Sequence, residues 1–490
     1  MGSVYDLLEQ AAQAWPEQTA LVDEYGLLSY RDLYVQIESL KTTLLQTGIG
    51  KGLGLAVMGR NGRAFVMAML AGMGCGAVVV PLSHQLKSVE ITQILFDTGV
   101  QAVLDDQSGV IPVDGHHVLM SLATQTLRFT WIDAAAKLAI TPLPDAAFIR
   151  YTSGTTGRSK GVVLTHRSIL ARVECASKAL QLDCNDAVLW ILPMAFHFLV
   201  SILVYIRVGA KIIVCKDLLA ATLIKEANEH QATMLYAAPM HFRLLAADVS
   251  NEQVPTLKTA ISTSSAVPLH IAEMFRQRFN VPVTQAYGII EAGLPLLDSL
   301  SGETDPRSVG FPTNGFSLAL LDENNAQVSE GQVGRLAIRG PGLFDAYLKP
   351  WQTAEQVMQD GWFLTGDLAC RQADGRIFIC GREKTMINVS GNKAFPEEIE
   401  SVLIAHPDIA ACHVFGEAHP LLGEVVCADV VLRHQAEWDV EGILQFCRGQ
   451  LSTYKVPQRM RVVVQITHTA SGKVKRGTPN IDGTTGKIKG

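Results

Sequence analysis

The chain has 490 residues, 48% of them hydrophobic and 18% charged, so it can build a sizeable core and is not a disordered chain. Its 41 basic and 47 acidic residues give a formal charge of −6, which argues against general nucleic-acid binding because that needs a positive surface. The nine cysteines show no Cys-x-x-Cys spacing, so a zinc ribbon or redox dithiol is not expected. Scattered cysteines and an N-terminus without a basic and apolar leader pattern predict a cytoplasmic protein.

The first two-thirds of the chain alternate helical and strand patterns. In chain order they predict a helix over 4–14, a strand over 28–30, a helix to 45, strands over 53–58 and 78–80 with a helix between them, a helix over 89–97 and a strand over 102–104. The same rhythm returns between 169 and 282, with strands over 188–192, 211–215 and 234–237. This alternation predicts a parallel sheet covered by helices.

Residues 65–82 carry no charge and are numerous enough to cross a bilayer. Gly72, Gly74 and Gly76 interrupt this stretch, and the residues before Pro81 have the pattern of a strand. We therefore favour a buried helix, a tight turn and a buried parallel strand over a membrane span.

The pattern changes near Gly310, where strands over 318–321, 334–339 and 376–380 become short and glycine-spaced and predict a small antiparallel β unit. A helix over 396–405 and a strand over 424–432 then predict a compact α+β domain. The expected fold is α/β: a large N-terminal domain of helix-covered, mostly parallel sheets plus a small β unit, residues 1–383, followed by a small mobile α+β C-terminal domain, residues 384–490. Lys384 marks the expected boundary.

The most informative segment is 151–161, Y-T-S-G-T-T-G-R-S-K-G. Glycines let several backbone N–H groups point at one anion, hydroxyls add neutral donors, and Lys160 can neutralise a phosphate. The spacing does not fit a P-loop, because Ser159 stands where Gly-Lys would be required. A flexible surface loop is the alternative interpretation.

This segment resembles the signature Y-T-S-G-T-T-G-x-P-K-G of the adenylate-forming enzymes, which include acyl-CoA synthetases, peptide-synthetase adenylation domains and firefly luciferase. Only Ser159, which replaces Pro, departs from it. Segments 28–33 and 70–82 are similar to further motifs of the same family. The resemblance implies an ATP phosphate site formed by Thr152, Ser153, Gly154, Thr155, Thr156, Gly157 and Lys160.

A second segment, Ala286-Tyr287-Gly288-Ile289-Ile290-Glu291, resembles the family motif x-Y-G-x-T-E. The resemblance implies that Tyr287 stacks on adenine between Ala286 and Gly288, and that Glu291 holds Mg²⁺ on the ATP phosphates. Ile290 departs from the motif, so the Thr hydroxyl that helps to hold the α-phosphate is missing.

The segment 361–367, G-W-F-L-T-G-D, matches another family motif. By this resemblance Asp367 binds the ribose hydroxyls, Arg382 lies near the ribose and phosphate, and Lys384 is the hinge. Ser390 and Gly391 resemble the loop that lines the path of the pantetheine thiol in thioester-forming members.

Near the C-terminus, the segment 469–473, T-A-S-G-K, resembles the family motif that carries the catalytic lysine, here Lys473. Its ammonium would bridge the substrate carboxylate and the α-phosphate, which neutralises charge as the two anions approach. A basic, unstructured tail is the alternative interpretation of this segment.

The acyl pocket is expected from a segment, 193–197, that is similar to the P-x-F-H stretch of acyl- and aryl-CoA synthetases. His197 stands where amino-acid-activating domains carry Asp, so an α-amino acid substrate is disfavoured; an ordinary core histidine is the alternative. An apolar helix is expected over 198–206, and the serines at 264 and 265 lie where relatives often carry glycines. The predicted pocket residues are Phe196, His197, Ser264, Ser265, Ile289 and Ile290.

The resemblance implies an enzyme, an AMP-forming acid–thiol ligase that uses ATP and Mg²⁺ to convert a small aryl or short-to-medium acyl acid into an acyl-adenylate. Coenzyme A or the phosphopantetheine of a carrier protein would then accept the acyl group. The catalytic residues would be Lys473, Glu291 and His197, and no nucleic acid or membrane span is expected. Two alternatives stay open: an enzyme that serves a carrier protein or stops at the adenylate, and a non-catalytic nucleotide-binding relative.

Overall fold

The computed structural model describes residues 2–133, 143, 145–152, 160–300, 304–390, 392–420, 422–434 and 436–466. With those gaps, the described residues form two compact units. Unit 1 comprises residues 2–152, 160–317 and 339–361, and unit 2 comprises 318–338 and 362–466. The short strands after Gly310 therefore group in part with the C-terminal residues, while the hinge at Lys384 stays a prediction.

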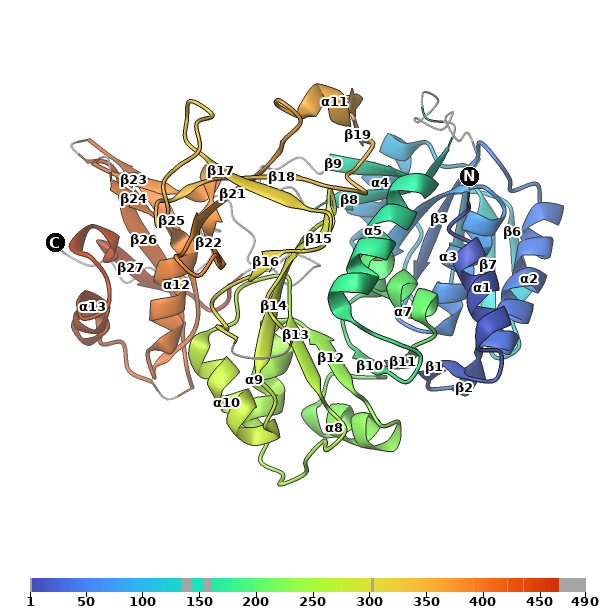
Figure 1. Ribbon diagram of the computed structural model, residues 1–490, viewed down its shortest axis with the longest axis horizontal. Coiled ribbons are helices and arrows are strands. Elements are labelled where there is room, and N and C mark those ends of the chain that lie inside the picture. Colours follow the sequence, from blue (N-terminus) through green and yellow to red (C-terminus); the bar gives the residue numbers. More distant parts are fainter. Residues whose placement is uncertain are drawn as a thin grey trace. The chain divides into compact units, whose positions relative to one another are not determined.

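The first sheet of unit 1 has nine strands among the described residues, and its centre is parallel (Figure 1). In spatial order the strands are β16 (Phe311–Pro312), β15 (Gly293–Leu297), β14 (Val283–Ile289), β13 (Thr259–Ser262), β12 (Met234–Ala237), β10 (Ala187–Trp190), β11 (Lys211–Val214), β1 (Thr19–Asp23) and β2 (Gly26–Ser29). The predicted strands over 188–192, 211–215 and 234–237 are thus confirmed as neighbours in one sheet.

The second sheet of unit 1 also has nine strands in the described part of the chain. Its order is β20 (Gln352–Thr353), β19 (Ala346–Leu348), β9 (Lys160–Thr165), β8 (Ala146–Thr152), β4 (Val78–Ser83), β3 (Gly54–Gly59), β5 (Ala102–Asp105), β7 (Thr126–Trp131) and β6 (His117–Ser121). Strands β5, β3 and β4 are parallel, whereas β8, β9 and β19 pair antiparallel. A central parallel core with antiparallel edges matches the expected α/β class.

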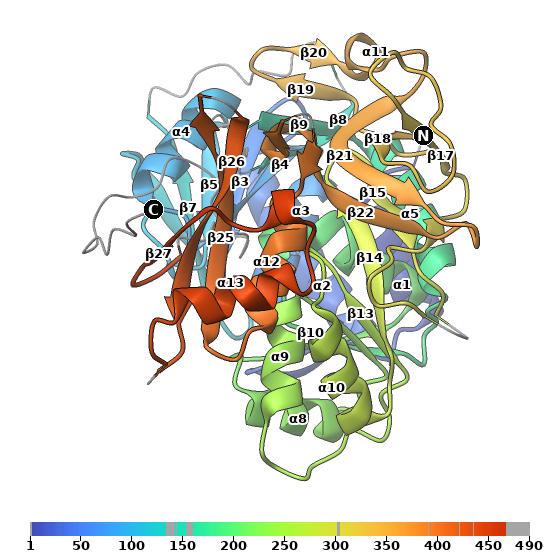
Figure 2. The ribbon, with the colours of Figure 1, turned by 90° about the vertical axis from the view of Figure 1, so that its left-hand side faces the viewer.

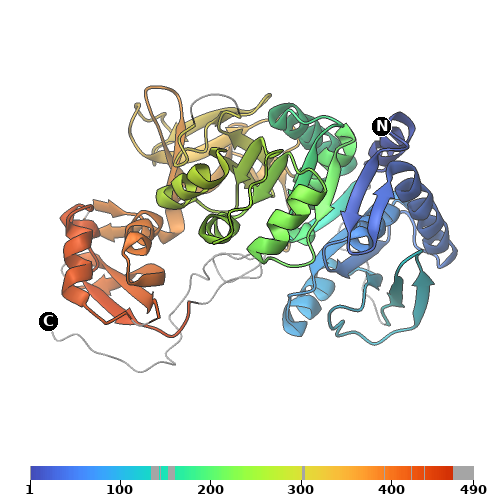
Figure 3. The ribbon, with the colours of Figure 1, turned by 90° about the horizontal axis from the view of Figure 1, so that it is seen from below.

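Helices cover both sheets of unit 1, and α1 and α2 pack side by side (Figure 3). Helix α5 contacts β8 and β9 of one sheet and β15 of the other, so it lies between the two sheets. The helices are α1 (Asp6–Ala14), α2 (Tyr30–Gln46), α3 (Arg63–Gly74), α4 (Ser88–Thr98), α5 (His166–Leu180), α6 (Met194–His197), α7 (Ile202–Val208), α8 (Ala220–Glu229), α9 (Pro239–Ala247), α10 (Leu269–Phe279) and α11 (Ala354–Val357).

The uncharged stretch 65–82 forms most of α3, a turn and most of strand β4, as predicted. Helix α3 is buried along almost its whole length, and β4 is buried on both faces. Gly72 permits close packing here, since a Cβ at this position would lie 3.0 Å from Val79 and 3.1 Å from Leu55. No helix in the described residues is long and apolar enough to span a membrane.

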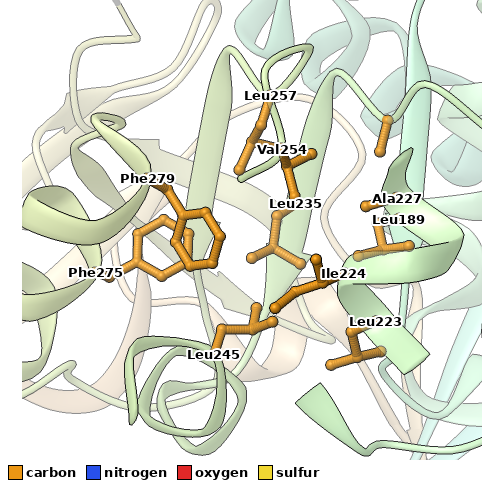
Figure 4. Close-up of a pocket in the computed structure, with 11 residues that line it drawn as sticks. Leu189, Leu223, Ile224, Ala227, Leu235, Leu245, Val254, Leu257, Phe275 and Phe279 are labelled. Atoms are coloured by element: carbon orange, nitrogen blue, oxygen red, sulfur yellow. The ribbon is translucent and has the colours of Figure 1, made fainter. Parts of the chain in front are cut away.

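One face of the first sheet packs against α8, α9 and α10. Leucine, isoleucine and phenylalanine side chains fill this layer and surround a small cavity (Figure 4). The cavity is lined by apolar side chains, including Leu189, Leu235, Phe275 and Phe279. With no polar group to orient a ligand, it belongs to the hydrophobic core and is not a functional site.

Unit 2 contains two sheets in the described residues, and the second is antiparallel except for β27, which pairs parallel with β26. The small β unit is the sheet β17 (Ser317–Leu321), β18 (Gly334–Arg339), β21 (Phe363–Arg371) and β22 (Ile377–Arg382), with β17 at the unit border. The second sheet comprises β24 (Asn392–Ala394), β23 (Ile387–Val389), β26 (Gly423–Leu432), β25 (Ile409–His419) and β27 (Arg459–Val462). Figure 2 shows α12 (Pro396–Ala405) and α13 (Val440–Arg448) packed on β25 and β26, which confirms the predicted α+β layer. Short 3₁₀ turns are η1 (Phe198–Val200), η2 (Glu383–Thr385) and η3 (Thr453–Lys455).

Candidate active site

The glycine-rich segment connects two antiparallel strands, β8 and β9. Strand β8 ends at Thr152, whose backbone pairs with Lys160 at the start of β9. The predicted phosphate ligands Ser153, Gly154, Thr155, Thr156 and Gly157 lie outside the described residues. The register of β8 and β9 nevertheless fixes where this segment leaves and re-enters the sheet.

Strand β19 lies beside β9 and brings a tyrosine to the phosphate segment. Tyr347 pairs in register with Val162, and the Nζ atom of Lys160 lies 4.5 Å from the centre of the Tyr347 ring. Gly161 allows this close approach, because a Cβ there would lie 3.0 Å from both Leu348 and the Tyr151 ring. Lys160 thus extends over an aromatic face at the edge of the predicted phosphate site.

Tyr347 also contacts the predicted metal ligand, Glu291. The Tyr347 hydroxyl donates a hydrogen bond of 3.0 Å to Oε1 of Glu291. Burial and the neighbouring Glu291 carboxylate raise the pKa of Tyr347, so the hydroxyl stays protonated and remains a donor. Lys160, Tyr347 and Glu291 therefore form one connected group in unit 1, although the sequence motifs did not include Tyr347.

Glu291 lies in the turn between β14 and β15, directly after the predicted adenine segment. Tyr287 is half-buried and Gly288 is exposed. A Cβ at Gly288 would lie 2.9 Å from the backbone oxygen of Gly293, so the turn needs glycine at this position. Ala286 and Ile290 are buried, and Ile289 is half-buried.

Arg172, on α5, holds this turn through its backbone. Its Nη1 donates to the Ile290 oxygen at 2.8 Å, its Nη2 lies 3.4 Å from the Glu291 oxygen, and its Nε donates to the Gly342 oxygen at 3.0 Å. Burial lowers the pKa of Arg172 to about 10, which leaves it a cation near neutral pH. The backbone N–H of Phe344 also donates to the Glu291 oxygen at 2.7 Å. The carboxylate of Glu291 is therefore presented from a tightly bonded turn.

The arrangement around Glu291 fits Mg²⁺ held mainly by substrate. Mg²⁺ usually binds through one or two carboxylates together with phosphate oxygens and waters. Among the described residues no cluster of three His, Cys, Asp or Glu side chains could form a complete metal cage. When bound to nucleotide, the ion would neutralise phosphate charge, and Glu291 is the side chain that would hold it.

The predicted acyl segment forms the short helix α6, on which Phe196 and His197 are half-buried. The His197 ring packs edge-on against Trp190 with their centres 6.0 Å apart, and Trp190 stacks on Tyr236 at the same distance. An aromatic wall therefore continues from α6 to the carboxyl ends of β10 and β12, where parallel sheets commonly bind ligands.

The expected single helix over 198–206 is wrong. The chain forms η1 and then α7, with a break at Ser201, whose φ of −138° and ψ of −70° are not helical. Apolar composition alone did not reveal this break, because every neighbouring residue is compatible with a helix. Ser264 and Ser265 follow β13, half-buried and exposed respectively. Ser264 has a φ of +75°, a conformation that favours glycine.

Unit 2 carries the other predicted nucleotide ligands. Asp367 on β21 and Arg382 on β22 are register partners, and Nε of Arg382 lies 3.0 Å from Oδ1 of Asp367. The Asp367 side chain is 6% exposed, whereas that of Arg382 is 37% exposed. A buried carboxylate held by an accessible guanidinium is suited to accept hydrogen bonds from ribose hydroxyls.

Of the remaining predicted site residues, two lie in the part of the chain that the structure describes. Lys384 is exposed in η2, next to Arg382. Ser390 is exposed with a φ of +50°, and its N–H donates to the Leu422 oxygen at 2.8 Å. Gly391 and Lys473 lie outside the described residues, so the thiol-path loop and the catalytic lysine stay predictions.

The hairpin of β8 and β9, the Glu291 turn and a separate C-terminal unit are the arrangement expected from the resemblance to adenylate-forming enzymes. The chain belongs to the AMP-binding enzyme family: it matches that family over residues 8–348 and the AMP-binding enzyme C-terminal domain over residues 398–473. The second match ends at the predicted catalytic lysine.

Curated relatives resemble the chain over nearly its full length. A sulfoacetate–CoA ligase of Cupriavidus necator is 29% identical, with 96% of each chain covered. A feruloyl-CoA synthase of an Amycolatopsis species is 28% identical, with 95% of this chain and 96% of the relative covered.

Among solved structures, O-succinylbenzoate coenzyme A synthetase from Bacillus subtilis in complex with AMP superposes with a TM-score of 0.85 at 23% identity, covering 99% of this chain and 100% of that one. The anthranilate CoA ligase AuaEII in complex with anthranoyl-AMP gives a TM-score of 0.84 at 22% identity, with 97% and 96% covered. These similarities confirm the predicted fold.

The chain is accordingly an AMP-forming acid–thiol ligase of the adenylate-forming superfamily. It uses ATP to activate a carboxylic acid as an acyl-adenylate and then forms a coenzyme A thioester.

Proposed function

We propose that the enzyme activates a small aryl or short-to-medium acyl acid, with Mg²⁺ as the cofactor of ATP and coenzyme A as the preferred thiol. The aromatic wall of His197, Trp190 and Tyr236 supports an acid with a flat or short body. On the segment 193–205 there is no Asp or Glu that could pair with an ammonium group, which disfavours α-amino acids.

The observation that carries the proposal is the connected group of Lys160, Tyr347 and Glu291. It places a cation and an oriented carboxylate at the entry of the glycine-rich segment. Attack of a carboxylate on the α-phosphorus of ATP requires the protein to position the reactants and to stabilise charge. It does not require a covalent bond between the protein and the substrate. A non-catalytic relative would have no need to hold the Glu291 carboxylate in one orientation.

The roles of the C-terminal residues follow from the family. We propose Lys473 as the lysine that completes adenylation, Lys384 as the hinge, and Ser390 and Gly391 as part of the thiol path. We also expect a reducing, cytoplasmic location, since all nine cysteines are free.

ATP–pyrophosphate exchange across a panel of aryl, acyl and amino acids tests the proposal. The proposal is supported if the exchange rate is highest with aryl or short-to-medium acyl acids. It is contradicted if the rate is highest with amino acids. Thioester formation with coenzyme A should exceed that with a phosphopantetheinylated carrier protein; the reverse preference makes the carrier protein the acceptor.

We expect Lys473→Ala to abolish exchange while ATP binding, measured by calorimetry, stays near the wild-type value. The loss arises because the ammonium stabilises charge that develops only as the two anions react. Wild-type exchange in this variant would show that Lys473 is not the catalytic lysine.

A further inference from the structure

Arg150 is a deeply placed cation that the family motifs do not include. It lies on β8, two residues before the strand ends at Thr152, and directly follows the buried residues Phe148 and Ile149. Burial lowers the pKa of Arg150 to about 10, so the guanidinium is still charged near neutral pH. Part of its surface nevertheless remains accessible to solvent.

The guanidinium of Arg150 lies against the acyl segment. Its Nη1 donates to the backbone oxygen of Phe196, and its central carbon lies 5.3 Å from the centre of the Phe196 ring. Its Nε is buried and has no hydrogen-bond partner. Phe196 precedes His197, which packs on Trp190, so Arg150 adjoins the same aromatic wall.

Two other buried arginines of unit 1 show how such a cation is normally satisfied. Arg63 binds the carboxylate of Asp23, with Nη2 2.6 Å from Oδ1 and Nε 3.0 Å from Oδ2. Arg172 donates to backbone oxygens of the β14–β15 turn and of Gly342. Arg63 thus pairs with a carboxylate through Nε and Nη2, and all three guanidinium nitrogens of Arg172 donate to backbone oxygens.

Arg150 has no such arrangement in the described part of the chain. Burial lowers the pKa of Arg150 and the charge of Glu291 raises it, but no ion pair within 4.0 Å joins the two side chains. The Glu291 carboxylate accepts a hydrogen bond from Tyr347 instead. The neighbouring segment 153–159 contains no Asp or Glu in its sequence. A buried cation with an N–H group that has no partner calls for an anionic partner, because an unpaired buried charge is costly.

Resting on the proposed function, we propose that Arg150 binds a second acidic group, a carboxylate or sulfonate, on the acid substrate. A guanidinium group can donate two parallel N–H hydrogen bonds to two oxygens of one carboxylate or sulfonate. The reacting carboxylate is the poorer candidate, since tight binding by a guanidinium would withhold its oxygens from the α-phosphorus. The pocket would therefore select short acyl or aryl acids that carry another anion beside or beyond the Phe196 ring.

Matched acids in the ATP–pyrophosphate exchange assay test this proposal on the full-length enzyme. Suitable pairs are butanoate with succinate, propanoate with 3-sulfopropanoate, and benzoate with isophthalate. We expect the wild type to prefer the doubly acidic member of at least one pair. Arg150→Met should lower kcat/KM for that acid about 10- to 100-fold, the usual loss for a charged hydrogen-bonded contact, and change the singly acidic partner little.

Two further variants separate specificity from folding. Arg150→Lys keeps the positive charge but removes the planar set of N–H donors. It should retain part of the preference for the doubly acidic substrate. Arg31→Met removes an exposed arginine that pairs with Glu17 and should leave both acids unchanged. If Arg150→Met does not fold, the wild-type preference and the Arg150→Lys result still decide the matter.

A wild type that favours the singly acidic partner in every pair would overturn the proposal. An equal loss for both members in Arg150→Met would also overturn it. If no acid supports exchange at all, the proposed function fails and the inference fails with it. Exchange with singly acidic substrates alone refutes only the inference.

Discussion

The hydrogen bond from Tyr347 to Glu291 gives the sharpest test of the unit 1 group. Tyr347→Phe removes the hydroxyl that donates to Oε1 at 3.0 Å and leaves the ring, which packs on Phe344 with centres 4.6 Å apart and lies under Lys160. A hydrogen bond to a charged group contributes about 1.5–3 kcal/mol, which corresponds to a loss of about 10- to 150-fold in kcat/KM. Because Glu291 is the proposed metal ligand, the loss should appear as a higher Mg²⁺ requirement in ATP–pyrophosphate exchange.

Tyr30→Phe is a matched control for this experiment. The Tyr30 hydroxyl is also buried and donates to the Ala210 oxygen at 2.8 Å, but it lies on α2 and is not part of the Glu291 group. Its loss should cost about 1 kcal/mol of stability without changing the Mg²⁺ dependence. A Tyr347→Phe enzyme with the wild-type rate and Mg²⁺ requirement would refute the assignment of Glu291 as an oriented metal ligand.

Two further results are expected. Arg172→Met should reduce the free energy of unfolding of unit 1 by about 2–4 kcal/mol in urea titrations, because the Ile290 and Gly342 oxygens lose a buried charged donor; an unchanged transition would contradict the role of Arg172. A hydrogen bond from Cys380 lowers the pKa of Cys370, while the pKa of Cys380 is raised, so iodoacetamide should label Cys370 first and at lower pH. Mass spectrometry over a pH series measures this order, and earlier labelling of Cys380 would disprove it.

Local patterns predicted the regular elements well. The strand over 234–237 and the helix over 396–405 have the predicted bounds, and glycines at 72, 74 and 76 correctly indicated a helix, turn and strand. These elements are determined by periodicity and by turn residues that lie within a few positions of each other. The break at Ser201 was missed because it depends on packing rather than on local propensity.

Non-local contacts explain what the sequence could not predict about the site. Tyr347 reaches Glu291 only because β19 pairs with β9, and no motif joins those strands in the sequence. Arg150 is similarly inconspicuous, since an arginine at the end of a strand usually lies in solvent. Its burial against Phe196 becomes visible only when α6 is placed beside β8.

The Ile290 substitution has a limited consequence when the whole turn is considered. A threonine hydroxyl would add one hydrogen bond to the α-phosphate, a contribution of about 1–3 kcal/mol to positioning. The backbone of the same turn is independently fixed by Arg172 and by the Phe344 N–H, and the Glu291 carboxylate is oriented by Tyr347. Because these contacts do not depend on the side chain at 290, the substitution weakens one phosphate contact without dismantling the group. The departure from the family motif is therefore compatible with an active enzyme.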